Sequence, residues 1–167
     1  MDDHERARSA VTTFAGRAEH FTDLVEEREH FESDEDLRSL AIAIAEVYAA
    51  SLELPEADLA DVSVDEGDGI DPKPPSGIAV RPTDHYWEVF DPLAPEPDDP
   101  TVGSLSDDVA DIYRDLMEGL EHYRLGRVEE AVWTWRFQRE IHWGNHAVDA
   151  LRALQRLLDG RDRSESP

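Results

Sequence analysis

The chain has no cysteine and few basic residues. Among its 167 residues, 16 are Lys or Arg and 40 are Asp or Glu, so the formal net charge is -24. The absence of cysteine excludes disulfides, thiolate metal ligands and thiol nucleophiles. The excess of negative charge repels phosphate backbones and anionic lipid surfaces. We therefore expect no nucleic acid and no membrane as a partner, and we favour a basic protein surface, a small cationic ligand or a metal ion.

Long hydrophobic runs and catalytic loops are also missing. The first residues, MDDHERARSAVTTF, lack the apolar core of a signal peptide, and no later stretch has the length of a membrane span. We therefore expect a cytoplasmic protein. There is no glycine-rich phosphate loop and no serine in a strand-to-helix elbow, so nucleophilic catalysis has no support. Any enzymatic activity would depend on carboxylates, histidines and a metal ion.

Hydrophobic spacing predicts four main helices in a single domain over residues 1–160. Apolar residues recur at steps of three and four in the segments 3–31, 34–54, 105–125 and 127–159. Ser33 suits the N-cap of the second helix, and Gly126 suits the end of the third. No alternating pattern is strong enough for a sheet. The expected fold class is all-α, an antiparallel bundle of four main helices, followed by a disordered tail at 161–167.

A long segment at 55–103 separates the second predicted helix from the third. It is rich in Pro, Gly, Asp and Glu, and a loop of this length is either partly disordered or functional. Its aromatic part, DHYWEVFDPL at 84–93, carries more apolar surface than a solvated loop would. We expect this part to fold back on the helices as a lid.

The predicted fourth helix carries charged residues on a face that should be buried. A helical wheel places seven small or apolar residues on one side: Trp133, Phe137, Gly144, Ala147, Leu151, Leu154 and Leu158. Arg136 and Glu140 lie on that same side, where an unpaired charge is strongly unfavourable. We therefore predict a binding site that contains Arg136, Glu140, Trp143 and, from the aromatic loop, Trp87.

Gly144 is a second unusual residue in this helix. Glycine costs about 1 kcal/mol relative to alanine inside a helix. A close approach by another helix, or by the ring of Trp87 or Phe90, would compensate for this cost.

Helix 105–125 carries an acidic stripe beside its apolar face. Asp108, Asp111 and Asp115, with His122 further along, share one flank at spacings of three, four and seven. Like charges at these spacings destabilise a helix, so we expect the fold to neutralise them.

Two kinds of neutralising group are available. One is protein: Arg136 and Arg139 on the next helix, joined by His142 and His146. The other is a divalent cation, Mg, Mn or Zn, because oxygen and imidazole ligands suit these ions. The predicted metal ligands are Asp108, Asp111, Asp115, His142 and His146. His142 and His146 stand one turn apart, with Asp149 continuing the row, and they lack the intervening glutamate of the hydrolytic HExxH motif.

Four segments resemble a bacterial family of small helical proteins classified as a domain of unknown function. They are YWEVFDPL, SLSDDVADIYRDLMEGL, AVWTWRFQREIHWGNHAVDALRAL and, more loosely, FAGRAEHFTDLVEE, so the resemblance extends from Phe14 to Leu158. It implies an all-helical, single-domain protein of the bacterial cytosol. It implies no particular reaction or ligand.

The segment DDVADIYRDL also resembles the second acidic motif of the all-helical nucleotide pyrophosphohydrolases. In that superfamily, carboxylates on paired helices hold magnesium ions, and Glu26 and Glu29 would be the partner motif here. The chain presents aspartates where the superfamily favours glutamate. We therefore expect, first, a non-catalytic binding or interaction module of uncharacterised function with an Asp/His/Arg cluster. The alternative is a divalent-metal-dependent enzyme such as a phosphohydrolase.

Overall fold

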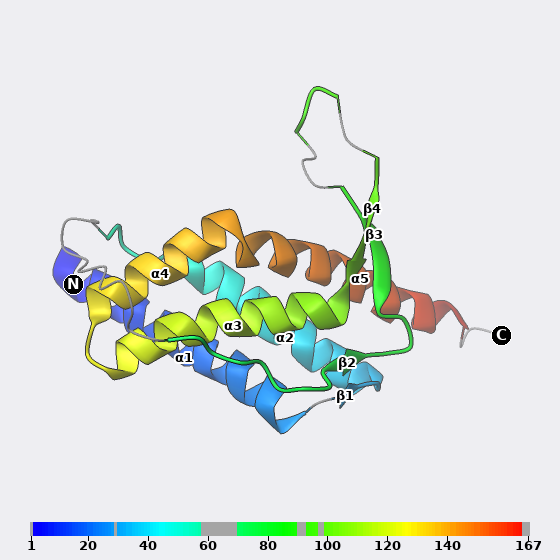
Figure 1. Ribbon diagram of the computed structural model, residues 1–167, viewed down its shortest axis with the longest axis horizontal. Helices are drawn as coiled ribbons and strands as arrows, with labels where there is room; N and C mark the ends of the chain where they lie inside the picture. Colours follow the sequence, from blue (N-terminus) through cyan, green and yellow to red (C-terminus); the bar gives the residue numbers. More distant parts are fainter. Residues whose placement is uncertain (1, 29, 58–69, 90–92, 97–98, 165–167) are drawn as a thin grey trace.

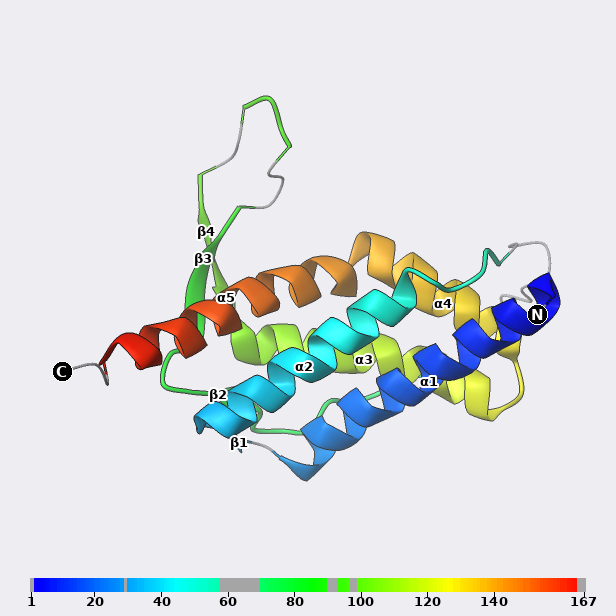
Figure 2. The same cartoon turned by 180° about the vertical axis from the view of Figure 1, so that it is seen from behind.

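The computed structural model describes residues 2–28, 30–57, 70–89, 93–96 and 99–164, with the side chains of 161–164 excepted. Within these ranges the protein is mostly helical, and the longer helices run roughly lengthwise beside one another (Figures 1 and 2). The helices are α1 (Asp3–Glu27), α2 (Asp34–Ser51), α3 (Leu105–Arg124), α4 (Val128–Ile141) and α5 (Trp143–Ser164). None of these described helices combines the length and the hydrophobicity that a membrane-spanning helix requires.

Helix α2 begins as the sequence predicts. The Ser33 hydroxyl accepts a hydrogen bond from the Asp36 amide, and the Asp36 carboxylate accepts one from the Ser33 amide, which is a complete capping box. The helix ends at Ser51, shortly before Pro55. Pro55 disfavours helical geometry in the residue before it, so the chain leaves the bundle at this point.

The single helix predicted over 127–159 is instead two helices. Helix α4 ends at Ile141, and His142 has φ -145° and ψ -88°, outside the helical region. Helix α5 begins at Trp143. Gly144 lies at this break, where an added Cβ would collide with the Arg139 carbonyl. The close approach of the last turn of α4, rather than of the ring of Trp87, therefore explains this glycine.

The buried face of α4 also differs from the predicted one. Trp135 is fully buried and its indole nitrogen donates to the Leu116 carbonyl (3.0 Å). Trp133 and Phe137, which the helical wheel placed in the core, stack on each other, with centroids 4.9 Å apart and Phe137 exposed. The wheel failed because it treated α4 and α5 as one continuous helix, whereas each part buries its own face.

The core lies between α1, α2 and the α3–α5 half of the chain. Phe14 of α1 contacts the rings of Trp135 and Trp143, with centroid separations of 4.7 and 6.5 Å. Tyr48 of α2 meets Trp143 edge to face. These aromatic contacts join the first two helices to both sides of the break.

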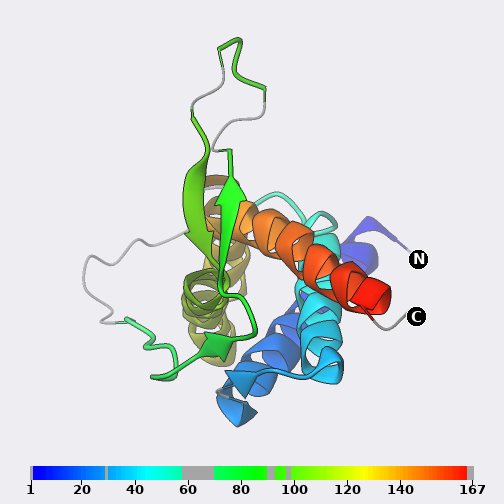
Figure 3. The ribbon, with the colours of Figure 1, turned by 90° about the vertical axis from the view of Figure 1, so that its right-hand side faces the viewer.

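Two small sheets, which the sequence pattern did not predict, accompany the helices. Strands β1 (His30–Phe31) and β2 (Ala79–Val80) pair in parallel, and β3 (His85–Glu88) pairs with β4 (Thr101–Ser104) in an antiparallel hairpin. The hairpin stands beside α5 and extends away from the helices (Figures 1 and 3). The strands are too short for a period-two pattern to be recognised.

The predicted aromatic lid is only partly realised. Tyr86 is half-buried against the helices, whereas Trp87 is 72% exposed. Phe90 lies outside the described residues. Residues 161–164, which were predicted to be part of a disordered tail, belong to the helical backbone of α5, which ends at Ser164. Residues 165–167 lie outside the described part of the chain.

Helix α3 starts directly from the hairpin. Asp84 accepts hydrogen bonds from the Ser106 amide (2.8 Å), the Ser106 hydroxyl (2.6 Å) and the Ser104 hydroxyl (2.9 Å). Burial alone would raise the pKa of Asp84, but the hydrogen bonds from Ser106 and Ser104 outweigh it and lower the pKa. Asp84 therefore joins the hairpin to the positive end of α3.

We predict that Asp84→Asn destabilises the protein at pH 7 by about 1–2 kcal/mol, because charge-assisted hydrogen bonds at a partly exposed site are lost. A lowered pKa means that the stabilisation is present above the unfolded-state pKa of about 3.9 and disappears as pH falls through the folded-state value. Urea unfolding followed by circular dichroism at pH 7 and at about pH 2.5 measures this difference. The exposed Asp99→Asn should match wild type at both pH values, and a pH-independent deficit in Asp84→Asn would contradict the assignment.

We also predict opposite effects for two glycine substitutions. A Cβ on Gly119 would collide with the Trp135 ring, so Gly119→Ala should destabilise the protein by about 1–3 kcal/mol. A Cβ on Gly16 of α1 would meet nothing within 4 Å, so Gly16→Ala should stabilise it by about 1 kcal/mol. Chemical denaturation of both variants tests the pair, and equal shifts would show that Trp135 does not pack against Gly119.

Candidate metal centre

The acidic stripe of α3 faces the junction of α4 and α5. Helices α3 and α4 lie side by side in opposite directions, with α5 continuing along α3 (Figures 1 and 2). Asp108 and Asp115 are only 3% and 4% exposed, whereas the side chain of Asp111 between them is 24% exposed. The predicted adjacency of the stripe and the two histidines is therefore present.

Asp115 holds the first histidine. His142 Nδ1 lies 2.7 Å from Asp115 Oδ2, and His142 is the C-cap residue of α4. An ionised carboxylate can only accept a hydrogen bond, so Nδ1 carries the donated proton. The other ring nitrogen, Nε2, is thereby left as an acceptor when the imidazole is neutral.

Asp108 holds the second histidine in the same manner. His146 Nδ1, in the first turn of α5, lies 2.8 Å from Asp108 Oδ1. The second oxygen of Asp108 accepts a hydrogen bond from the Tyr86 hydroxyl (2.7 Å). Gly103 lies opposite Tyr86 in the hairpin, and a Cβ there would be 2.6 Å from the Tyr86 ring. The hairpin thus positions Asp108, and Asp108 positions His146.

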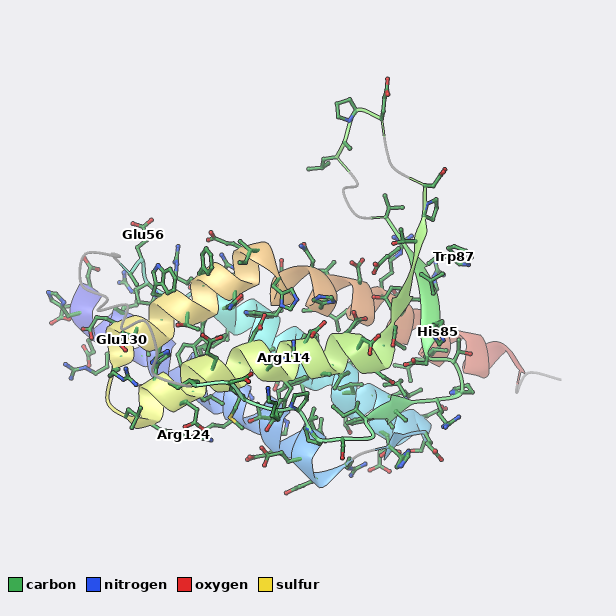
Figure 4. All side chains as sticks on the ribbon, in the orientation of Figure 1. Glu56, His85, Trp87, Arg114, Arg124 and Glu130 are labelled. Atoms are coloured by element: carbon green, nitrogen blue, oxygen red, sulfur yellow. The ribbon has the colours of Figure 1, made fainter. Side chains whose placement is uncertain are left out.

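Asp111 completes the cluster. Its Oδ1 accepts a hydrogen bond from Arg114 (2.6 Å), one turn along α3, and its Oδ2 lies 3.6 Å from His146 Nε2. Arg114 lies on α3 close to the centre of the molecule in Figure 4. One ligand atom from each of Asp111, His142 and His146 falls within 4.8 Å of the others, and each of the three side chains is partly exposed. An ion from solvent can therefore reach the cluster.

The electrostatics of the cluster follow from burial. Desolvation raises the pKa of Asp108 and of Asp115, although the paired histidines oppose this effect. The hydrogen bond that His146 donates to Asp108 raises the pKa of His146, against the effect of its own burial. Burial and the nearby charges of Glu88 and Asp108 likewise raise the pKa of Asp149. Burial therefore disfavours the ionised form of these carboxyl groups, and the hydrogen bonds with the histidines act in the opposite direction at Asp108 and Asp115.

The arginines predicted to neutralise the stripe are engaged elsewhere. Arg136 donates to the Leu54 carbonyl (2.8 Å) and Arg139 donates to the Ser51 carbonyl (3.0 Å). Arg139 therefore satisfies a carbonyl group at the C-terminal end of α2, where cations are favourable, and Arg136 satisfies one in the segment that follows this helix. The prediction that Arg136 pairs with the aspartates of α3 is wrong, because the buried face of α4 is rotated from the one assumed.

The other predicted binding residues do not share one surface. Trp143 is fully buried and donates to the Trp135 carbonyl (3.2 Å). The Glu140 side chain is 58% exposed and lies 3.4 Å from Arg139. Trp87 lies on the hairpin (Figure 4). Likewise, His122 leaves the stripe and faces Glu130 (3.4 Å).

The proposed phosphohydrolase partner motif is not near the stripe. Glu26 accepts a hydrogen bond from the Tyr113 hydroxyl (2.7 Å), and Tyr113 lies on the opposite side of α3 from Asp111 and Asp115. Glu29 lies outside the described residues. The sequence did not predict Tyr86 as a polar partner of the site, and the only signal for it is its place in the aromatic segment 84–93.

Comparison with known proteins gives a family but no activity. No curated protein and no solved structure matches the chain. A family model described as a domain of unknown function, DUF5063, matches residues 76–159, which is half of the chain. The matched segment includes the hairpin, α3, α4 and most of α5, and thus every residue of the cluster, whereas the N-terminal segment FAGRAEHFTDLVEE lies outside it. The sequence predicted a family of unknown function, and the chain belongs to the DUF5063 family.

Proposed function

We propose that this protein binds a divalent transition-metal ion through Asp111, His142 and His146. The observation that carries the proposal is the pair of buried carboxylates behind the histidines. Asp115 and Asp108 each hold an Nδ1, His146 Nε2 lies 3.6 Å from Asp111 Oδ2, and one ligand atom from each of Asp111, His142 and His146 lies within 4.8 Å of the others. Metal-binding histidines almost always have such a hydrogen-bond partner on the second ring nitrogen.

The spacing of the ligand atoms fits one ion. Ligands at about 2.0–2.2 Å from a metal ion lie about 3.0–3.5 Å from each other in tetrahedral or octahedral geometry. Asp111 Oδ2 and His146 Nε2 are 3.6 Å apart, and the widest separation in the cluster is within 4.8 Å. Small rotations of the three side chains would therefore bring them to coordination distance.

The ligand types favour particular ions. Two imidazoles and one carboxylate suit Mn, Fe or Zn better than Mg or Ca, which prefer oxygen ligands. Three protein ligands also leave coordination positions open for water or an external ligand. A metal ion at this cluster fits both functions predicted from the sequence. It would be the catalytic ion of a metal-dependent enzyme, or the bound ligand of a non-catalytic binding module.

We predict saturable binding of Zn²⁺ and Mn²⁺, with a weaker response to Mg²⁺, in isothermal titration calorimetry of the metal-free protein. His142→Ala, His146→Ala and Asp111→Asn should each weaken the affinity by about tenfold or more, since each removes one of three ligands. Asp107→Asn on the exposed side of α3 and His20→Ala on α1 are matched controls and should bind as wild type. Unchanged Zn²⁺ affinity in Asp111→Asn and His146→Ala would refute the site.

A separate prediction concerns Asp115, which acts as a positioning residue for His142. Asp115→Asn keeps all three ligands but presents a weaker acceptor to Nδ1, so we expect Zn²⁺ affinity to fall by about 10- to 100-fold. Nitrogen-15 NMR of the histidine rings in the metal-free protein should show a smaller Nδ1–H population for His142 at high pH. If neither the affinity nor the tautomer changes, Asp115 has only a structural role.

A further inference from the structure

We propose that a cavity between strand β3 and the middle of α5 binds a small organic anion, namely a phosphate or carboxylate carried on a planar ring. The cavity has a volume of about 340 Å³, which suits a small ligand. Its walls bring together two arginines and two aromatic rings: Arg152, Arg156, Tyr86 and Trp87. This inference goes beyond the metal site and does not depend on it.

The two arginines supply a positive wall. Arg152 and Arg156 stand one helical turn apart on α5 and line the same cavity. Like charges at this spacing repel each other. Among the described residues neither forms an ion pair, although the chain has 40 acidic residues. Asp149 also lines the cavity and is affected by the charge of Arg152, so cations outnumber carboxylates there by two to one.

The aromatic wall is unusual because one ring is left in water. Trp87 is 72% exposed, whereas Tyr86 beside it on β3 is half-buried and bonded to Asp108. His85 and Trp87 project from β3 on the hairpin next to α5 (Figure 4). An indole that lines a cavity and remains open to solvent is a stacking surface for a planar group.

The floor of the cavity is apolar. Leu105, at the start of α3, is 1% exposed, and Ala153 of α5 is 8% exposed. These residues belong to the main core, so the floor is formed before any ligand arrives. A preformed apolar floor with a few charged groups at the edge is the usual arrangement of a small-molecule site.

The net charge of the chain does not prevent anion binding at this place. At physiological ionic strength, charges more than about 8 Å apart are largely screened. The nearest charges therefore dominate, and guanidinium groups bind phosphate and carboxylate through paired hydrogen bonds. A planar anion would place its oxygens on the arginines and its ring on Trp87.

Titration of phenyl phosphate and of benzoate into the metal-free protein tests this inference, with tryptophan fluorescence and calorimetry as readouts. We expect saturable binding of at least one probe at about 1 mM or below, accompanied by a fluorescence change that Trp87→Phe removes. Arg152→Gln and Arg156→Gln should each weaken binding by about tenfold or more. Both arginines are exposed, so neither variant should alter the thermal unfolding of the protein. Arg38→Gln, at an exposed position on α2, is the matched control and should bind as wild type.

The outcomes separate the possible ligands and the two sites. A preference for phenyl phosphate identifies a phosphate ligand, and a preference for benzoate identifies a carboxylate ligand. Inorganic phosphate binding as tightly as phenyl phosphate would overturn the requirement for a ring. The absence of saturable binding, or unchanged binding in both arginine variants, would overturn the inference as a whole. Zn²⁺ titration of the same arginine variants should match wild type, so failure of one site is distinguishable from failure of the other.

Discussion

Two buried carboxylates on α3 determine how the candidate site is assembled. Asp108 and Asp115 are almost completely removed from water, and each meets the Nδ1 of a histidine from the α4–α5 junction. A buried carboxylate without a partner is strongly unfavourable, so these two pairs fix the position of α3 against the junction. The orientation of both imidazole rings, and therefore of the proposed metal ligands, is a consequence of satisfying these two acids.

The β3–β4 hairpin is coupled to the same interaction. The Tyr86 hydroxyl donates a hydrogen bond to Asp108, and Asp84 at the base of the hairpin accepts hydrogen bonds from the first turn of α3. Tyr86 also lines the cavity that contains Arg152 and Arg156. One short hairpin therefore supports a histidine of the proposed metal centre on one side and forms a wall of the proposed anion site on the other. A ligand in the cavity would lie next to the hydrogen bond that positions His146.

The amino-acid pattern predicted the helices and the meeting of the acidic stripe with the histidines, but not the detailed contacts. Periodicity and capping residues are local signals, and they located α1, α2 and α3 well. The break at His142 has only a weak signal in the sequence, because a single glycine inside a helical pattern, Gly144, is compatible with an unbroken helix. Missing the break rotated the assumed face of α4, which exchanged Trp133 for Trp135 in the core and misassigned Arg136. The role of Tyr86 depends on a hairpin whose strands are too short to be recognised.

Helices α1 and α2 contribute to the core but lie outside the segment that the family model matches. All side chains of the proposed metal centre lie within residues 76–159, yet Phe14 and Tyr48 outside that segment cover Trp135 and Trp143. A fragment limited to the matched segment would retain every ligand while exposing two indoles and the inner faces of α3 and α5 to water. The family match therefore covers only part of the packed core of this chain, because α1 and α2 lie outside residues 76–159.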